Sequence, residues 1–65
     1  MNLDSKIYIA GHRGLVGSNL YTYLKELGHT NLITRTSSEL DLRNQQEVNT
    51  FFEQEKPEYV FLAAA

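Results

Sequence analysis

The sequence predicts an α/β fold, in which a parallel β-sheet is flanked by helices. Three short apolar runs alternate along the chain with two segments of helical periodicity. The apolar runs are continuous, as in the strands of a parallel sheet that is covered on both faces. Right-handed crossovers then join the elements in the order β-α-β-α-β. With 65 residues, the chain is at most one small domain.

The first strand and the first helix flank a glycine-rich loop. Residues 6–10 form a run of β-branched and aromatic side chains that is typical of a buried strand. A helical period extends over residues 15–27, and Gly28 follows where a left-handed helix cap favours glycine. The side chains that we expect on the apolar face of this helix are Val16, Leu20, Tyr23, Leu24 and Leu27.

The second half of the chain repeats this alternation. We expect a second strand over residues 31–34 and then a second helix, which Pro57 ends. Asn44 and Glu47 have the spacing of a capping box at the start of that helix. A third apolar run, residues 59–65, predicts a third buried strand.

We expect the strands in the spatial order 3-2-1, which leaves the first strand open on its other side. The full sequence contains no repeat, no low-complexity segment and no internal domain boundary. We therefore interpret residues 1–65 as the N-terminal piece of a longer protein. The alternative is a complete small domain that covers its open sheet edge by self-association.

Composition argues against several classes of function. The net charge of −2 leaves no basic surplus for a nucleic-acid partner. No apolar segment approaches the roughly 20 residues that span a membrane, and the first residues lack a signal-peptide pattern. The chain has no cysteine and two histidines, so we expect no metal site and a reducing, cytoplasmic location.

The glycine-rich loop carries the most specific chemical pattern. Its three glycines are spaced three residues apart, directly after a strand and directly before a helix. In a dinucleotide-binding fold the first permits a sharp turn, the second lets a pyrophosphate approach the backbone, and the third lets the helix pack closely. The helix N-terminus offers unpaired N–H groups to the phosphates. The cofactor-binding residues predicted here are Gly11, His12, Arg13, Gly14, Leu15, Val16 and Gly17.

This context predicts the N-terminal half of a Rossmann fold, a doubly wound parallel sheet that binds NAD or NADP. A chain specific for NAD places an acidic residue at the end of the second strand, where it accepts the ribose 2′-hydroxyl. This chain has Arg35 there, and a guanidinium pairs with a 2′-phosphate instead. Arg13 and the Ser37 hydroxyl are candidates for the same phosphate, so the predicted cofactor is NADP. The alternative roles are solvated surface charges for the arginines and a capping role for Ser37.

Four further residues are candidates for the cofactor site. Asp41 and Leu42 precede the second helix, in a segment open to an extended conformation, at the place where this architecture holds the adenine. The carboxylate can accept the exocyclic amine and the leucine can pack on the ring, although Asp41 is equally suited to a helix cap. Ala63 and Ala64 end the third strand and leave room for the ribose and pyrophosphate; tight packing would also explain them.

No catalytic residue is predicted in this chain. Tyr21 and Lys25 have the spacing of a dehydrogenase pair, but Lys25 lies about 140° from the centre of the helix's apolar face and points to solvent. We expect His12 to be a loop spacer that offers its backbone to phosphate, and His29 to be solvated.

The string IAGHRGLVGS is more specific than the glycine spacing alone. With other matching segments it resembles the bacterial GDP-L-fucose synthase family, a branch of the extended short-chain dehydrogenases/reductases, over the whole chain. One departure is Ser37, where the family often carries a second basic residue. The segments that carry the resemblance are residues 9–18, 35–36, 39–42, 51–52 and 60–65.

The resemblance implies an NADPH-dependent enzyme that converts GDP-4-keto-6-deoxy-D-mannose to GDP-L-fucose by two epimerisations and a hydride transfer. It also implies that the parent protein is a homodimer with a nucleotide-sugar substrate. The family's catalytic Ser, Tyr, Lys, Cys and His follow residue 65, so the chain alone should not catalyse the reaction. Other interpretations are another NADP-linked reductase or dehydratase of this family, a non-catalytic dinucleotide sensor, or a purely structural fragment.

Overall fold

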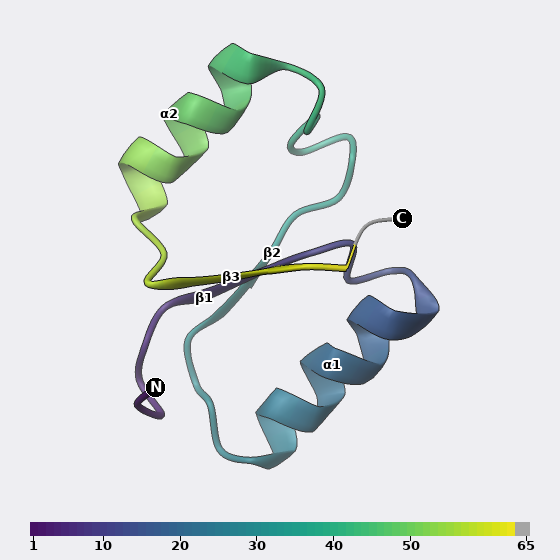
Figure 1. The fold of residues 1–65 in the computed structure, drawn as a ribbon, viewed down its shortest axis with the longest axis vertical. Coiled ribbons are helices and arrows are strands. Elements are labelled where there is room, and N and C mark those ends of the chain that lie inside the picture. Colours follow the sequence, from purple (N-terminus) through teal and green to yellow (C-terminus); the bar gives the residue numbers. More distant parts are fainter. Residues whose placement is uncertain (64–65) are drawn as a thin grey trace.

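The computed structural model describes residues 1–63 and contains the predicted alternation of strands and helices (Figure 1). All strand pairs are parallel. The α/β class and the element order expected from the sequence are therefore confirmed. The elements are β1 (Ile7–Ala10), α1 (Leu15–Glu26), β2 (Leu32–Thr34), α2 (Gln45–Glu55) and β3 (Tyr59–Leu62).

The strand order is β2-β1-β3, so the predicted order 3-2-1 is wrong. β3 pairs with β1 and not with β2: Ile7 lies opposite Tyr59, and Ala10 lies opposite Leu62. On its other side β1 pairs with β2, with Ile7 opposite Leu32. β1 is therefore central and paired on both sides, and the expectation that it lacks a neighbour is also wrong.

The side chains of β1 explain this order. Tyr8 and Ala10 belong to the apolar cluster under α2, whereas Ile7 and Ile9 belong to the cluster under α1. A right-handed crossover to β2 puts α1 on one face, and the crossover back past β1 to β3 puts α2 on the other (Figure 1). In the order 3-2-1 both helices would cover one face, leaving half of this fully apolar strand uncovered.

The face that α1 turns to the sheet differs from the predicted one. Leu24 and Gly17 are buried as expected of a contact face, but Val16, Tyr23 and Leu27 are more than half exposed. Tyr21 packs instead beside Leu24 in the cluster with Ile7 and Ile9. The reason is the close approach of the helix at Gly17, which brings the stripe 17, 20, 21 and 24 onto the sheet.

The end of α1 has the geometry that Gly28 predicted. Gly28 has a φ of 100°, and its N–H donates to Lys25 O. The N–H of His29 donates to Leu24 O, which completes a Schellman motif. His29 is buried, contrary to the solvated position expected, and its Nδ1 has no hydrogen-bond partner in the described part of the chain.

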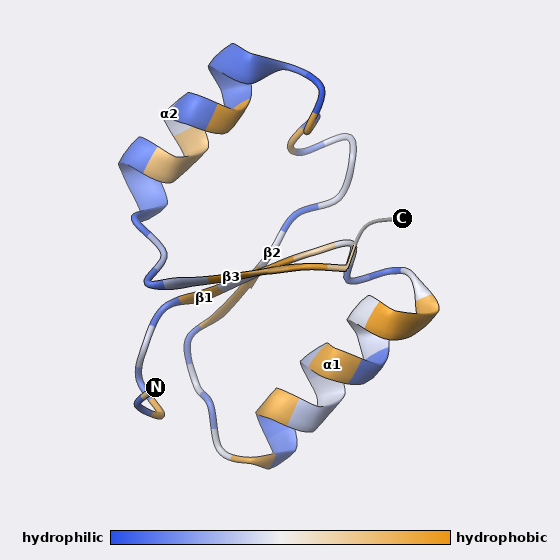
Figure 2. Ribbon diagram, viewed as in Figure 1, coloured by the Kyte–Doolittle hydropathy of each residue, from blue (hydrophilic) through white to orange (hydrophobic). Residues whose placement is uncertain are grey.

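The second crossover contains α2 and the turns before it. Residues 40–42 form no strand; Leu40 instead packs into the cluster beside Tyr8 and Phe51. After α2, Lys56 adopts a left-handed conformation with a φ of 47°, before Pro57. Strands are the most apolar part of the ribbon, whereas α2 is polar except on its sheet-facing side (Figure 2).

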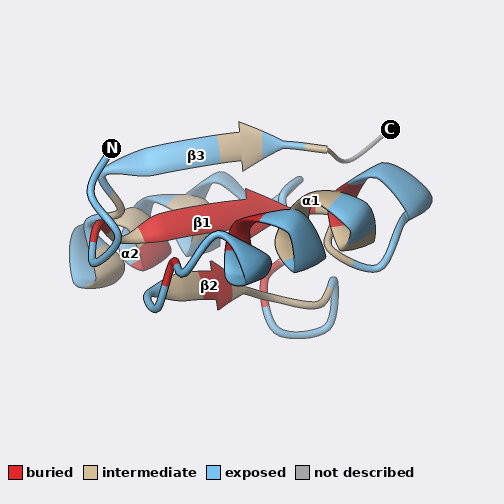
Figure 3. Cartoon of the chain, turned by 90° about the horizontal axis from the view of Figure 1, so that it is seen from below, coloured by how far each residue is buried: buried red, intermediate tan, exposed pale blue. Residues whose placement is uncertain are grey.

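Burial differs sharply between the central and the outer strands. Every residue of β1 is buried, whereas β3 lies at the edge of the sheet with Tyr59, Val60 and Leu62 exposed (Figure 3). Among the described helices, none is long and apolar enough to cross a membrane.

Candidate dinucleotide-binding site

The three loop glycines follow the carboxyl end of β1. The structural reason for a glycine differs from one position to the next. Gly11 has a φ of 84°, in the left-handed region that turns the chain out of the strand. A Cβ on Gly17 would lie 1.9 Å from the carbonyl oxygen of Gly11, so α1 can pack against the loop only with glycine there. Both findings match the roles predicted for these two residues.

Gly14 is the exception, because the chain itself does not require a glycine at this position. Its φ is −74°, and a Cβ there would meet its nearest neighbour, Gly11 O, at 3.5 Å, an ordinary contact. Gly14 is also the N-cap of α1 and is exposed. An unhindered backbone at this point is what the approach of a pyrophosphate requires.

The first turn of α1 is not capped by any side chain of the described residues. The cap residue, Gly14, has no side-chain acceptor, and the turn contains no acidic residue. Leu15 and Val16 follow it and are 80% and 68% exposed. The N–H groups of this turn thus have no side-chain acceptor among the described residues, and they lie at the positive end of the helix dipole, where an anion binds favourably.

A hollow of about 230 Å³ lies beside this helix start, at the carboxyl ends of β1 and β2. It brings together six of the predicted cofactor-binding residues from two separate loops. Its lining includes two arginines and no carboxylate among the described residues, so it favours an anionic ligand. The lining residues are Tyr8, Gly11, His12, Arg13, Arg35, Thr36, Ser37, Leu40 and Leu42.

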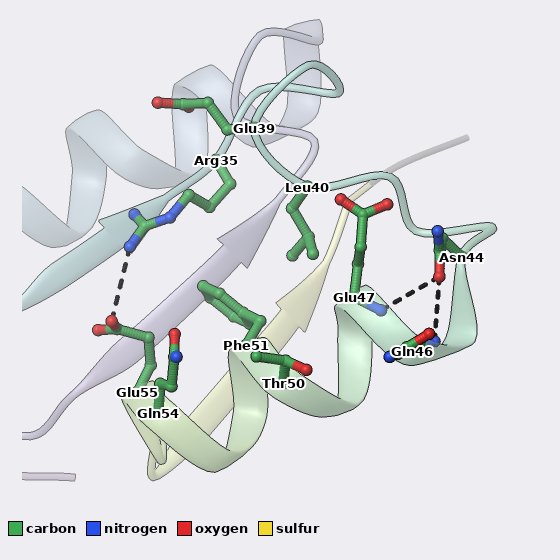
Figure 4. Close-up of a pocket in the computed structure, with 10 residues that line it drawn as sticks. All are labelled: Arg35, Glu39, Leu40, Asn44, Gln46, Glu47, Thr50, Phe51, Gln54 and Glu55. Carbon is green, nitrogen blue, oxygen red and sulfur yellow. Dashed lines mark hydrogen bonds and ion pairs between the residues drawn. The ribbon is translucent and has the colours of Figure 1, made fainter.

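Arg35 lies on the wall between this hollow and a second one, of about 390 Å³, against α2 (Figure 4). Its NH1 donates to Thr34 O at 2.7 Å, and its NH2 lies 3.7 Å from Glu55 Oε2. The guanidinium carbon lies 5.3 Å from the centre of the Phe51 ring. The Arg35 guanidinium, which is predicted to bind the 2′-phosphate, is thus half-buried and held by other groups of the protein.

The remaining predicted residues in the described part of the chain do not line the smaller hollow. Asp41 Oδ1 accepts from the backbone N–H and the Nε of Arg43, and the hydrogen bonds from Arg43 lower the pKa of Asp41. Ala63 N donates to Ala10 O, so Ala63 continues the alignment of β3 with β1. Ala64 lies outside the described residues. The cofactor roles of these residues stay predictions.

Sequence reasoning missed three lining residues: Tyr8, Thr36 and Leu40. Burial raises the pKa of the Tyr8 phenol, and nearby Arg35 lowers it in part, so the phenol stays a hydrogen-bond donor. Thr36 and Glu39 form the reciprocal hydrogen bonds of a capping box around a turn: Thr36 N donates to Glu39 Oε1, and Glu39 N donates to Thr36 Oγ1. The Thr-x-x-Glu spacing was the sequence signal that could have identified it.

The arrangement can bind a phosphate-containing ligand, but it holds no reactive pair of side chains. Tyr21 and Lys25 lie on the later turns of α1, where Lys25 Nζ is 5.9 Å from the centre of the Tyr21 ring. They line a separate hollow with Gly28 and His29, away from the glycine loop. In residues 1–63, no group of three or more acidic, histidine or cysteine side chains could hold a metal ion.

Comparison with known proteins agrees with this geometry. The sequence profile of the NAD dependent epimerase/dehydratase family matches residues 7–65. This chain belongs to that family. The matched residues include the glycine loop and the end of β2.

Relatives in this family include proteins of plants and bacteria. GDP-L-fucose synthase 1 of Arabidopsis thaliana is 59% identical over 62 residues, which are 95% of this chain and 19% of that protein. GDP-L-fucose synthase of Escherichia coli is 43% identical over 60 residues, 92% of this chain and again 19% of that protein. The resemblance to this group found in the sequence is confirmed, and it is not restricted to bacteria.

Solved structures of family members superpose on the whole chain. A GDP-mannoheptose C4 reductase from Campylobacter jejuni with NADP bound matches with a TM-score of 0.97 and 55% identity, over 21% of its own chain. A GDP-D-glycero-L-gluco-heptose synthase from the same organism, in the presence of NADPH, matches with a TM-score of 0.98 and 55% identity, over 19%. The chain therefore spans about a fifth of the proteins that it matches.

Proposed function

We propose that this chain is the NADP(H)-binding segment of a nucleotide-sugar epimerase/reductase that converts GDP-4-keto-6-deoxy-D-mannose to GDP-L-fucose. The observation that carries the proposal is the hollow that joins the glycine loop to the end of β2, beside the uncapped start of α1. The identity to GDP-L-fucose synthases over nearly the whole chain supports the choice of reaction.

Each part of the cofactor has a proposed partner. The pyrophosphate binds over Gly14 and the N–H groups of Leu15, Val16 and Gly17. The 2′-phosphate binds Arg35 and Arg13, with the Ser37 hydroxyl as a further donor. The adenine lies against Leu42 near Asp41, and Ala63 and Ala64 leave room for the ribose.

Preference for NADP over NAD follows from the lining of the hollow. Two arginines line the hollow where an NAD-specific chain presents a carboxylate. Bound NADPH supplies the hydride for the reduction. The chain's own residues bind and orient that cofactor, whereas the groups that handle the sugar belong to the rest of the longer protein. We therefore expect the chain alone to bind cofactor without turnover.

A second function within the same family is reduction of a different GDP-linked sugar. The heptose reductase and heptose synthase structures are 55% identical to this chain, nearly as much as the plant fucose synthase. The residues that line the hollow are assigned to the cofactor in this proposal, so they do not distinguish one GDP-linked sugar from another. A cytoplasmic location, which the absence of cysteine supports, and a homodimeric parent are part of the proposal.

The test is an amide NMR titration of the labelled chain with NADP⁺ and, in parallel, NAD⁺. We expect shifts at residues 11–17 and at Arg35 with NADP⁺, and much weaker shifts with NAD⁺. R35Q should remove this preference. K25Q is the control, because it also removes one positive charge, at an exposed position of α1 that lines only the separate hollow beside Gly28. Equal responses to both cofactors would refute the arginine assignment, and no response to either would refute cofactor binding by this chain.

A further inference from the structure

Arg35 is the residue that the proposed function needs for the 2′-phosphate, yet its guanidinium is already engaged. Figure 4 shows the side chain extending from the end of β2 toward Glu55 in the last turn of α2. Because α2 runs antiparallel to the strands, its last turn lies near the amino ends of the strands (Figure 1). The glycine loop lies at their carboxyl ends. Arg35 is thus drawn away from that loop along the α2 face.

Glu55 binds two cations at once. Its Oε1 lies 3.2 Å from Lys6 Nζ, and its Oε2 lies 3.7 Å from Arg35 NH2. The three side chains are about 30% exposed, so these ion pairs are only partly screened by solvent. The distance from Arg35 NH2 to Glu55 is too long for a hydrogen bond, so Glu55 attracts the guanidinium without a directional bond, while NH1 donates to Thr34 O at 2.7 Å.

The position of Arg35 gives it two possible partners, Glu55 and a ligand in the smaller hollow. The residue lines the hollow that contains Glu55 and also the hollow that contains Gly11 and Arg13. A 2′-phosphate in the second hollow carries nearly two negative charges and three acceptor oxygens, and it competes with a single carboxylate for the same fork of donors.

We propose that Glu55 is a specificity-determining residue: its carboxylate competes with the cofactor's 2′-phosphate for Arg35 and thereby limits the preference for NADP over NAD. This inference rests on the proposed function, because it assigns the 2′-phosphate to Arg35. Glu55 acts through Arg35 and touches no part of the cofactor, so it is a positioning residue. Lys6, by sharing the carboxylate, weakens its hold on Arg35.

The experiment measures dissociation constants of NADP⁺ and NAD⁺ for the 65-residue chain and its variants by NMR titration. E55Q should strengthen NADP⁺ binding about two- to fivefold, the range of an exposed ion pair, and leave NAD⁺ binding unchanged. E53Q is the matched control, because it removes the same charge from an exposed position of α2 that lines neither hollow. It should change neither constant.

A double-mutant cycle separates the proposed route from a general charge effect. In the R35Q background, E55Q should have no effect on either constant, because the group through which it acts is gone. K6Q should shift the preference in the opposite direction, since Glu55 then has Arg35 as its single cation. K6Q also keeps the inference testable if E55Q fails to give a folded spectrum.

The inference is overturned if wild type prefers NADP⁺ and E55Q leaves that preference unchanged or weakens it. An equal gain from E55Q in the R35Q background would overturn it as well. Failure of the proposed function looks different: the wild-type chain then binds neither cofactor, or binds both equally, and the inference fails with it.

Discussion

The two helices begin at the same edge of the sheet, but they satisfy their first backbone N–H groups differently. α2 begins at Asn44, whose Oδ1 accepts from Gln46 N at 3.1 Å and from Glu47 N at 3.2 Å. α1 begins at Gly14, and no side chain of the described residues accepts from its first turn. One helix start is capped by its own side chain, and the other leaves its donors without a side-chain acceptor among the described residues.

The difference teaches which features of a helix start serve the fold and which serve binding. Asn44 is a favourable cap in any helix, so its presence says nothing about a ligand. Glycine at the corresponding place in α1 is not demanded by φ or by space, because an added methyl group would meet its nearest neighbour at a tolerable 3.5 Å. Gly14 thus serves the fold only as an N-cap, at which glycine is acceptable, and the close approach of a ligand is the role that we propose for it in addition.

The largest expected effect is the loss of stability in G17A. This substitution disrupts the packing between Gly17 and Gly11, which positions the start of α1. Its Cβ would lie 1.9 Å from Gly11 O, so the loop and α1 must separate. We expect a loss of about 3 kcal/mol in the free energy of unfolding, at the upper end for overpacking. Chemical denaturation measures it; unfolding at the wild-type midpoint would contradict the contact geometry.

G14D makes the start of α1 resemble that of α2. The new carboxylate caps the first turn and occupies the donors proposed for the pyrophosphate. We expect NADP⁺ affinity to fall by at least about tenfold, the loss of one charged hydrogen bond, while stability is retained or rises by up to about 1 kcal/mol. Titration and thermal unfolding test both parts; unimpaired binding would show that the pyrophosphate lies elsewhere.

G14A is the control for G14D, since it adds a Cβ without a charge or an acceptor. Alanine is a poor N-cap, so stability should fall by up to about 1 kcal/mol. The affinity for NADP⁺ should fall less in G14A than in G14D, because the added methyl group hinders only the close approach of the pyrophosphate to the backbone.

N44A tests the closed helix start. Two N–H groups lose their acceptor, and we expect a loss of about 1 kcal/mol in stability with unchanged cofactor affinity. N44G, which makes this position resemble Gly14, should cost only a few tenths of a kcal/mol. A drop in NADP⁺ affinity in N44A would contradict the division of roles between the two helices.

The smallest expected effect is a pH dependence at the capping box before α2. Two hydrogen bonds with Thr36, first the one from its backbone N–H and then the one with its side chain, lower the pKa of Glu39 from its ordinary value of 4.5. Because the folded-state pKa is lowered, the stabilisation is complete above pH 4.5 and is lost as the pH falls through the lowered pKa. E39Q should therefore differ most from wild type near neutral pH.

Urea denaturation of wild type and E39Q at several pH values gives this comparison. The difference between the free energies of unfolding of wild type and E39Q should decrease steadily as the pH is lowered. A gap that is constant from neutral pH to below the carboxyl range would show that the Glu39 carboxylate does not act as an acceptor in the folded chain.

Local sequence determined the elements and most of the candidate site. The apolar runs located the strands, Gly28 located the end of α1, and the glycine spacing located the turn at the end of β1. Six predicted residues from two loops meet in one hollow, because the carboxyl ends of neighbouring parallel strands share one edge of the sheet. The Asn44 cap was predicted too, but Asn44 N does not donate to the Glu47 carboxylate as in a full capping box; it donates to Asp41 O instead.

Tertiary structure alone decided the strand order, the rotation of α1 and the partners of Arg35. Local periodicity does not say on which side of β1 the third strand pairs; that depends on covering both faces of β1 at once. The face of α1 was set by the contact at Gly17 rather than by the most apolar stripe. Glu55 meets Arg35 from 20 positions away only because α2 packs antiparallel across the sheet, a long-range relation that no local pattern encodes.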